Sequence, residues 1–349
     1  MRIIIKIQAT LIFLAIVASP AWAEEDSEIC QSLYSAKSYK EAIPYCSSAA
    51  QAGDSSAQYQ LANMLFYGKG LEWDYNSEDY KYNQAIKWYK KAAKQGVLEA
   101  QNQLAFMYRY GYGVQVDHDR SLDWYNKAAE AGNGEAYYKL SLIYDEGDIV
   151  PKNPHNAAKL LLKAAEHDYL IAQKKLAYSY HYGENARQDY TKAAQWYLKA
   201  AKQGDAFSQF SLAYFYYQGL GVTQDYSEAA TWFSEAASHG DMKAQHNLGI
   251  MYENGMGVSK NLKRAAKWYM KAAKKGHAAS QHSLGSIFSE GRGIRPNPEK
   301  AYAWWSTAAA QGESRAAASR DAFAKNLPPE KLALAQELSE RYIKKYTLQ

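Results

Sequence analysis

The sequence predicts an all-α protein, a right-handed superhelical α-solenoid of stacked helical hairpins. Three observations predict it: a tryptophan recurs every 36 residues, a leucine and a tyrosine recur with the same period, and glycines follow each tyrosine. A fixed period of this length is typical of proteins in which each hairpin packs only on its neighbours. The tryptophan column holds Trp88, Trp124, Trp196, Trp232, Trp268 and Trp304, with Leu160 at the remaining position.

The first 23 residues have the features of a secretory signal. Arg2 and Lys6 form a basic start, and an apolar run over 7–17 leads to a small-residue cleavage site at 21–23. That run is too short and too interrupted to predict a spanning helix, and no other stretch approaches 20 uninterrupted apolar residues. We therefore expect the leader to be removed. The mature chain would begin near Glu24, have no membrane span and be periplasmic or secreted.

The charge balance argues against a nucleic-acid partner. The chain has 41 basic and 36 acidic side chains, and loss of the leader would leave a net charge of +3. Nucleic-acid-binding proteins concentrate far more positive charge. Lysine clusters at 87–94 and 263–275 recur at three- and four-residue spacing. This spacing is typical of solvated helix faces.

The two cysteines lie in a degenerate hairpin that precedes the repeats, over residues 24–53. Cys30 and Cys46 are each eight residues from Ser38, which lies at the expected turn between helices near 29–37 and 40–52. Equal distances from a turn place two residues opposite each other, and an exported chain meets an oxidising compartment. We predict a disulfide that pins this hairpin. Two free buried thiols are the alternative.

The first helix of each repeat has its core residues four apart, as Ala100, Leu104 and Tyr108 illustrate. Gly111 and Gly113 then end that helix, because glycine adopts the left-handed capping conformation without a clash.

The second helix begins at an N-cap column and ends at a glycine. An Asp or Asn side chain accepts a hydrogen bond from the first turn of a helix, and proline fits directly after it, as at Pro154 and Pro298. Alanines on this helix allow close packing. Only the repeat with Leu160, Leu161 and Asp168 departs from the pattern, and we expect it to fold. The N-cap column is Asp117, Asn153, Asp189, Asp225, Asn261 and Asn297.

The combined pattern resembles a known repeat family. Ala-x-x-x-Leu-x-x-x-Tyr-x-x-Gly-x-Gly-Val, an Asp or Asn, and Ala-x-x-Trp-Tyr-x-x-Ala-Ala-x-x-Gly are similar to the Sel1-like repeat, a relative of the tetratricopeptide repeat. The resemblance covers 54–312 and implies seven repeats. Capping helices are expected over 313–349, because an open solenoid end would expose its core. The last helix would start at 328–330 and pack Leu334, Leu338 and Tyr342 against the final repeat.

A partner surface is predicted on the concave wall that the first helices build. At 100° per residue, positions two, six and nine after the core alanine face away from the core. The centre of this stripe is aromatic, and tyrosine-rich exposed surface is typical of protein interfaces. Packing of several of these side chains between adjacent helices is the alternative. The candidate residues are Phe106, Tyr138, Lys174, Tyr178, His181, Phe210, Tyr214, Tyr217 and His246.

A second candidate surface is an insertion in the first repeat. Gly53 and Gly96 are 43 residues apart, seven beyond the period, and the excess falls around 71–76. Insertions in repeat proteins map to loops on one face, which is often a binding face. Trp73 and Tyr75 are therefore candidate anchors for a partner. Packing of the loop on its own repeat is equally compatible with the sequence.

Catalytic motifs are missing from the chain. Some exported, cysteine-rich members of the similar family bind or hydrolyse β-lactams, but no lysine here has a serine three positions before it, as an acylating Ser-x-x-Lys site requires. There is no HExxH, no CxxC and no pair of histidines four apart, so no metal and no cofactor is expected. A β-lactam or cell-wall hydrolase remains the alternative.

The sequence as a whole predicts an exported, non-enzymatic scaffold that binds a protein partner and is a monomer. Three roles suit such a scaffold: immunity to a secreted effector, binding of a host protein in virulence, and assembly of an envelope complex. The repeat framework has no code for the partner, whose identity stays open.

Overall fold

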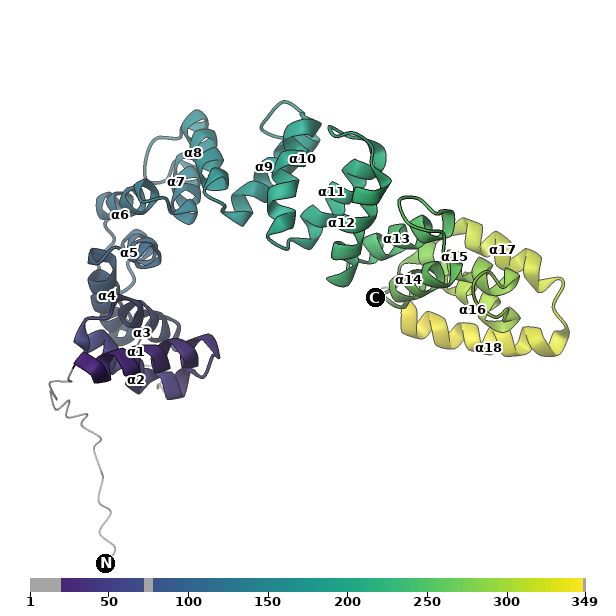
Figure 1. The fold of residues 1–349 in the computed structure, drawn as a ribbon, viewed down its shortest axis with the longest axis horizontal. Coiled ribbons are helices and arrows are strands. Elements are labelled where there is room, and N and C mark those ends of the chain that lie inside the picture. Colours follow the sequence, from purple (N-terminus) through teal and green to yellow (C-terminus); the bar gives the residue numbers. More distant parts are fainter. Residues whose placement is uncertain (1–19, 72–77, 348–349) are drawn as a thin grey trace, which may run out of the picture. The chain divides into compact units, whose positions relative to one another are not determined.

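A computed structural model describes residues 20–71 and 78–347 (Figure 1). These residues form α-helices joined by short turns and contain no strand, which confirms the all-α solenoid class. None of the described helices combines the length and the apolar character needed to cross a bilayer. The predicted leader falls almost entirely outside the described residues, and Trp73 and Tyr75 also lie outside them.

The chain divides into two compact units, and each is described by itself. The N-terminal unit is Met1–His167. Each of its helices packs on its neighbours in the chain, and α1 also packs on α3. Its helices are α1 (Pro20–Ser35), α2 (Tyr39–Ala52), α3 (Ser55–Tyr67), α4 (Glu78–Lys94), α5 (Leu98–Tyr110), α6 (His118–Glu130), α7 (Gly134–Glu146) and α8 (Pro154–Glu166).

The C-terminal unit is Asp168–Gln349 and has the same hairpin organisation, closed at its end by α18, which packs along α16. Its helices are α9 (Leu170–Tyr182), α10 (Tyr190–Lys202), α11 (Ala206–Gln218), α12 (Tyr226–Ser238), α13 (Met242–Asn254), α14 (Leu262–Lys274), α15 (Ala278–Glu290), α16 (Pro298–Ala309), α17 (Ser314–Ala324) and α18 (Pro329–Tyr346).

The predicted N-cap column is confirmed at all six positions. Asp117 accepts a hydrogen bond from the amide of Arg120 at 2.9 Å, and Asn261 accepts one from Arg264 at the same distance. The other four residues of the column make the same contact. Each such bond satisfies an amide at the helix start that would otherwise lack a partner. The second helices therefore begin where the sequence predicts.

The irregular repeat folds despite its departures from the consensus. Asp168 has a left-handed backbone, with φ of 57°, at the position where Gly132 and Gly204 have φ of 91° and 87°. Aspartate tolerates this conformation better than most residues because its short side chain bonds locally. The Asp168 carboxylate accepts a hydrogen bond from Gln173 at 3.1 Å. The helix that follows, α9, consequently starts in the same register as its equivalents.

The ring after each tryptophan is the main core element of a repeat. Tyr125, Tyr197 and Tyr269 are almost completely buried, whereas most tryptophans of the column are half-buried. A lysine lies over the ring of four of these tryptophans, as where Lys271 Nζ lies 4.0 Å from the ring centre of Trp268. The half-buried tryptophans pack against the edges of the core clusters, and Trp304 is the one tryptophan of the column that is fully buried.

A column of small residues on the first helix accommodates that ring. Ala105, Ala177 and Ala213 lie five positions after the core alanine and share clusters with their rings. The last two repeats have glycine there. A Cβ at Gly249 would lie 2.7 Å from the Tyr269 ring, and one at Gly285 would lie 2.4 Å from the Trp305 ring. In the last repeat, glycine in place of alanine thus leaves room for the ring of Trp305, which is larger than the tyrosine of other repeats.

The N-terminal hairpin is closed by the predicted disulfide. The sulfurs of Cys30 and Cys46 are bonded at 2.01 Å, and both side chains are fully buried. The helices α1 and α2 that carry them pack on each other.

The C-terminal cap forms, but in a different helical register from the predicted one. Leu334 is 58% exposed, whereas Ala335 and Ser339 are buried, so the expected contact of Leu334 is wrong. Tyr342 packs as predicted, with its ring centre 4.7 Å from that of Trp304. The packed residues Ala335, Ser339 and Tyr342 are spaced by four and then three positions, which matches 3.6 residues per helical turn. A constant spacing of four, as predicted, would move successive residues around the helix and away from the final repeat.

Candidate protein-binding site

The C-terminal unit exposes a group of large apolar side chains on two neighbouring first helices. On α9, Ile171, Tyr178 and Tyr182 are 49, 42 and 52% exposed, and on α11, Phe207 and Tyr214 are 47 and 39% exposed. We call these five residues the aromatic patch. Their exposure separates them from the aromatic side chains of the core, which are at most 9% exposed.

The repeat register places the five residues on one surface. Residues 171, 178 and 182 differ by seven and eleven positions, so they lie within about 40° of each other around α9. Phe207 and Tyr214 are the equivalents of Ile171 and Tyr178 one repeat later. Because consecutive hairpins stack in the same orientation, the patch continues from α9 to α11.

A layer of packed rings supports the patch. The His181 ring lies 4.8 Å from Phe215 of the next repeat and 4.1 Å from Tyr182. Its Nδ1 atom is 3.1 Å from the hydroxyl of Tyr197. Burial lowers the pKa of His181 and raises the pKa of Tyr197, so both groups are neutral near pH 7. The exposed tyrosines therefore stand on an uncharged and well-packed base.

An ion pair beside the patch ties its two helices together. Lys174 Nζ lies 2.6 Å from the carboxylate of Asp205, which also caps α11. Burial opposes ionisation of Asp205, but hydrogen bonds from Lys174 and Ser208 lower its pKa overall. Lys175, next to this pair, is exposed and adds a positive charge to the rim. An apolar centre with a polar rim is the usual composition of a protein interface.

The structure places only two of the nine predicted concave-stripe residues on the patch, namely Tyr178 and Tyr214. The other seven are half-buried, two of them in the N-terminal unit and five in the C-terminal unit. The seven are Phe106, Tyr138, Lys174, His181, Phe210, Tyr217 and His246.

In the second repeat, the repeat that follows covers two of the three positions that the prediction places on the surface. At position two, Asn102 donates to Asn133 at 2.8 Å. At position nine, Arg109 is only 9% exposed and donates to Glu146 and Asp148 of the following repeat. A first helix is covered by its hairpin partner on one side and by the next first helix on another. The solvent-exposed side of a first helix therefore differs from the predicted one. It contains the position before the core alanine and the positions six and ten after it.

Three patch residues were not among the predicted ones: Ile171, Tyr182 and Phe207. A signal for two of them is present in the sequence. Three other repeats have a charged residue in the column of Ile171 and Phe207, namely Glu99, Glu135 and Lys243. A large apolar residue in this column would have indicated a departure from the framework.

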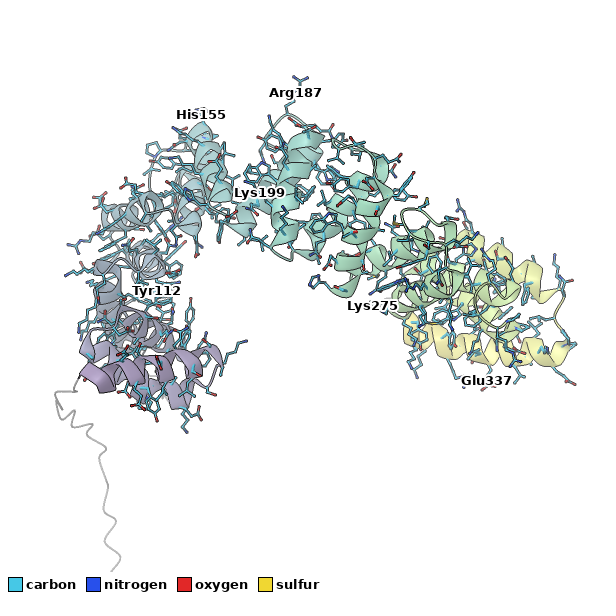
Figure 2. The ribbon with its side chains drawn as sticks, in the orientation of Figure 1. Tyr112, His155, Arg187, Lys199, Lys275 and Glu337 are labelled. Atoms are coloured by element: carbon cyan, nitrogen blue, oxygen red, sulfur yellow. A yellow bond between two sulfur atoms is a disulfide. The ribbon has the colours of Figure 1, made fainter. Side chains whose placement is uncertain are left out.

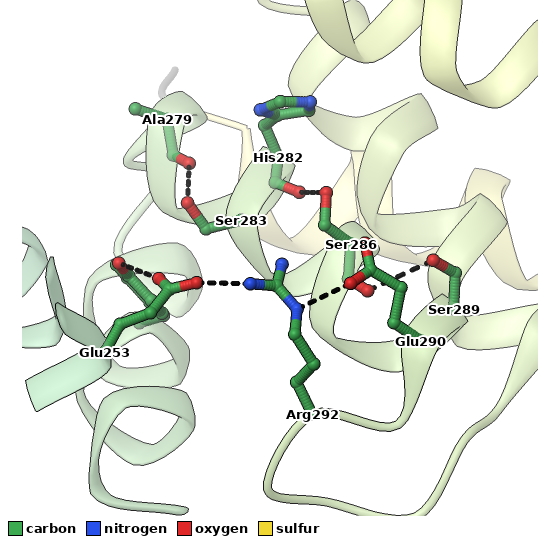
Figure 3. Close-up of polar contacts among 9 residues, drawn as sticks. Glu253, Ala279, His282, Ser283, Ser286, Ser289, Glu290 and Arg292 are labelled. Carbon is green, nitrogen blue, oxygen red and sulfur yellow. Dashed lines mark hydrogen bonds and ion pairs between the residues drawn. The ribbon is translucent and has the colours of Figure 1, made fainter. Parts of the chain in front are cut away.

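Two joints between repeats carry equivalent ion pairs of opposite polarity. In the N-terminal unit, Arg109 bonds to Asp148 of the next repeat at 2.7 Å. In the C-terminal unit, the same two positions hold Glu253 and Arg292, which also pair (Figure 3). Tyr269 donates its hydroxyl to Glu253 at 2.7 Å, so that joint includes the core ring.

A serine between two histidines bears on the hydrolase alternative. Ser280 Oγ lies 2.9 Å from His246 Nδ1 and 3.0 Å from His277 Nδ1. A hydroxyl beside an imidazole is the arrangement of an activated nucleophile. However, Ser280 is fully buried, and His277 also caps α15 by accepting from the Ser280 amide. A substrate has no approach to this hydroxyl, so the cluster supports packing of the last two repeats.

This cluster makes the stability of the C-terminal unit depend on pH. Burial and the neighbouring His277 lower the pKa of His246 to about 4, below the unfolded value of about 6.5. The stabilisation is therefore fully present above pH 6.5 and is lost as the pH falls toward 4. With solvent screening taken into account, we expect wild type to lose about 2 kcal/mol more than His246→Gln between pH 7.5 and 4.5. Chemical denaturation at the two pH values measures this difference.

His155 provides the matched control, because its side chain is exposed on α8 (Figure 2). His155→Gln should keep the wild-type dependence on pH. If His246→Gln also kept it, another group would be responsible for the acid sensitivity.

Within the described residues, no group of three or more His, Cys, Asp or Glu side chains is placed to hold a metal ion.

Comparisons with known proteins identify the repeats. The model of the Sel1 repeat matches seven consecutive segments, 55–97, 98–133, 134–169, 170–205, 206–241, 243–277 and 278–313. A search of curated proteins finds no match.

Solved structures similar to this chain come from several bacteria. A protective antigen present in uropathogenic Escherichia coli strains is 34% identical, with a TM-score of 0.58, over 93% of this chain and 70% of that one. A Sel1 repeat protein from Oxalobacter formigenes is 30% identical, with a TM-score of 0.48, over 85% and 86%. An immunity protein from Pseudomonas aeruginosa is 22% identical, with a TM-score of 0.34, over 62% and 80%.

Proposed function

The chain belongs to the Sel1 repeat family, and from this premise we propose that it is an exported, non-enzymatic scaffold that binds a protein partner through the aromatic patch. Proteins of this architecture act through the surfaces that their stacked helices present.

The exposure of the patch is the observation that carries the proposal. Five large apolar side chains, four of them aromatic, are 39–52% exposed on adjacent helices. Contiguous apolar surface is rare on soluble proteins unless it binds something. Tyrosine and phenylalanine bury much area for little loss of side-chain entropy, which suits them to be anchors in an interface. The expected partner is a protein segment with apolar side chains at its contact centre.

Two observations support an exported protein. A buried disulfide between Cys30 and Cys46 persists in oxidising compartments and is rare in the cytosol. The similar Escherichia coli chain is described as a protective antigen. Together with the leader predicted over 1–23, they favour a periplasmic or secreted location. Among the three roles predicted above, the description of this relative favours binding of a host protein.

Removal of the patch side chains should strongly weaken partner binding and leave the fold intact. For Tyr178→Ala/Tyr182→Ala/Tyr214→Ala we expect roughly a 30-fold or greater loss of affinity, because anchor residues of an interface commonly contribute 2 kcal/mol or more each. The measurement is quantitative pull-down from envelope and host-cell extracts, followed by titration of the captured protein. Photo-crosslinking from position 178 would show which protein lies on the patch.

Tyr45 on α2 is the matched control, since it is also a partly exposed tyrosine, at 38%. Tyr45→Ala should bind like wild type, and all variants should unfold at the wild-type temperature. A partner that binds the triple variant and wild type equally would refute the patch as its site. A purified protein that turned over a β-lactam such as nitrocefin would refute the non-enzymatic function.

A further inference from the structure

The second helix of the sixth repeat, α14, has an unusually uniform charge. Residues 262–275 contain six basic side chains and no acidic one. Lys263, Lys267, Lys271 and Lys274 follow each other at spacings of four, four and three and are all exposed, so they form a row along one side of the helix. The chain as a whole is close to neutral, so this row is a local concentration of charge.

Most of these cations have no partner that neutralises them. Arg264 lies over the ring of Tyr252, Lys271 lies over Trp268, and Lys275 donates to the carbonyl of Gly240 at 2.6 Å. These contacts orient the side chains and leave their charge in place. Within the described part of the chain, Lys263 and Lys267 form no ion pair.

The end of the chain adds two further lysines to the same region. Gln281 donates its amide both to the carbonyl of Ala273 in α14 and to that of Tyr346 in α18. The C-terminal ends of these two helices therefore lie beside each other, as Figure 1 also shows. Lys344 and Lys345 are exposed in the last turn of α18. We call the basic side chains of 263–275 together with Lys344 and Lys345 the basic surface.

Few acidic residues lie near the basic surface. On α12, Glu228 and Glu235 are the equivalents of Arg264 and Lys271 one repeat earlier, and on α16, Glu299 is the equivalent of Lys263 one repeat later. On α18, Glu340 is exposed one turn before Lys344. These four carboxylates do not balance eight cations. The field above this surface is therefore positive and extends about one Debye length into solvent.

The side chains of the basic surface suit an anionic lipid surface better than a protein or a nucleic acid. Among the described residues 262–275 and 342–347, no large apolar side chain is exposed, whereas such an anchor is usual in a protein interface. Tyr269 is buried and Lys271 lies over the outer face of Trp268, so neither ring offers a free face on which bases could stack. Seven of the eight cations are lysines, flexible point charges that suit phosphate groups without a fixed geometry. An anionic lipid surface offers such phosphates and requires no apolar anchor.

We propose that the basic surface docks the protein on a membrane leaflet rich in anionic phospholipid. This interaction is additional to the proposed partner binding, because α14 and α18 contribute no residue to the aromatic patch. Membrane docking would concentrate the protein on a surface and leave the patch free for its partner.

Vesicle co-sedimentation of the full chain tests the proposal. Vesicles of phosphatidylcholine with 30% phosphatidylglycerol (about one anionic lipid in three) should bind wild type, and pure phosphatidylcholine should not. Lys267→Gln/Lys271→Gln/Lys274→Gln should bind at least tenfold more weakly. The matched control is Lys192→Gln/Lys199→Gln/Lys202→Gln, which removes the same charge from α10, a helix that also has no acid. Raising the salt from 50 to 300 mM should weaken wild-type binding (roughly tenfold or more).

Several outcomes would overturn the proposal. Equal losses in the two triple variants would mean that only net charge matters. Binding to pure phosphatidylcholine, or no binding to anionic vesicles, would exclude docking on anionic lipid. Retention on an immobilised polyanion such as heparin without vesicle binding would assign the surface to a polymer instead. None of these results depends on partner capture, so failure here leaves the aromatic patch untouched, and the reverse also holds.

Discussion

Gly285→Val is expected to lower the free energy of unfolding of the C-terminal unit by about 3 kcal/mol, near the upper end for an overpacked core. Even a single carbon added at this position would lie 2.4 Å from the ring of Trp305, which is itself buried. The ring cannot retreat, because Phe323 packs against it at a centroid distance of 5.3 Å. Urea unfolding followed by tryptophan fluorescence measures the change.

The neighbouring residue and a compensating substitution make the test specific. Ser286→Val introduces the same side chain into α15 at a half-exposed position and should change stability by less than about 0.5 kcal/mol. Gly285→Ala/Trp305→Tyr recreates the pair that Ala105 and Tyr125 form in the second repeat, and it should be more stable than Gly285→Ala alone. If the two substitutions added independently, direct contact between glycine and ring would not be the cause.

Cys30→Ala/Cys46→Ala is expected to destabilise the N-terminal hairpin by about 3 kcal/mol. The cross-link joins residues 16 positions apart, and closing a loop of about that length reduces the entropy of the unfolded chain by this amount. At the end of a solenoid the loss is local, since the hairpin has a neighbour on one side only. Hydrogen exchange of the α1 and α2 amides should accelerate roughly 100-fold.

Reduction of wild type provides an independent route to the same state. A reductant should accelerate exchange in α1 and α2 of wild type and have no effect on the double variant. Amides of α17, at the other end of the chain, should exchange alike in all samples. Unchanged exchange in α1 and α2 after reduction would show that the packing of the helices, and not the cross-link, holds the hairpin.

The fold could be predicted almost completely because its signals are local. A capping carboxylate such as Asp117 acts on an amide three residues away, and a glycine such as Gly111 ends a helix through its own backbone. The disulfide was predictable for the same reason, since the symmetry of one short hairpin determines which residues meet. Features of this kind repeat with the period and require no knowledge of how hairpins stack.

The surface could be predicted only in part because it depends on stacking. The angle at which each first helix meets the next one decides whether position nine is solvent-exposed or, as for Arg109, enclosed. That angle depends on the contact between two repeats, so the sequence of one repeat alone does not determine it. Tyr178 and Tyr214 were predicted because their position is exposed in both registers, and Ile171 and Phe207 depart from a mostly polar column, whereas Tyr182 required the structure.

The two ion-paired joints have their positive and negative residues at opposite positions, and this limits how repeats can be rearranged by recombination. Repeat arrays lengthen and shorten when recombination between similar segments duplicates or deletes whole units. If the sixth repeat came to precede the third, Glu253 would face Glu146 and Asp148, three carboxylates at a joint where one of the partners is enclosed. Such a product would fold poorly. The opposite polarity of these two joints thus disfavours the rearrangements that would bring their like charges together.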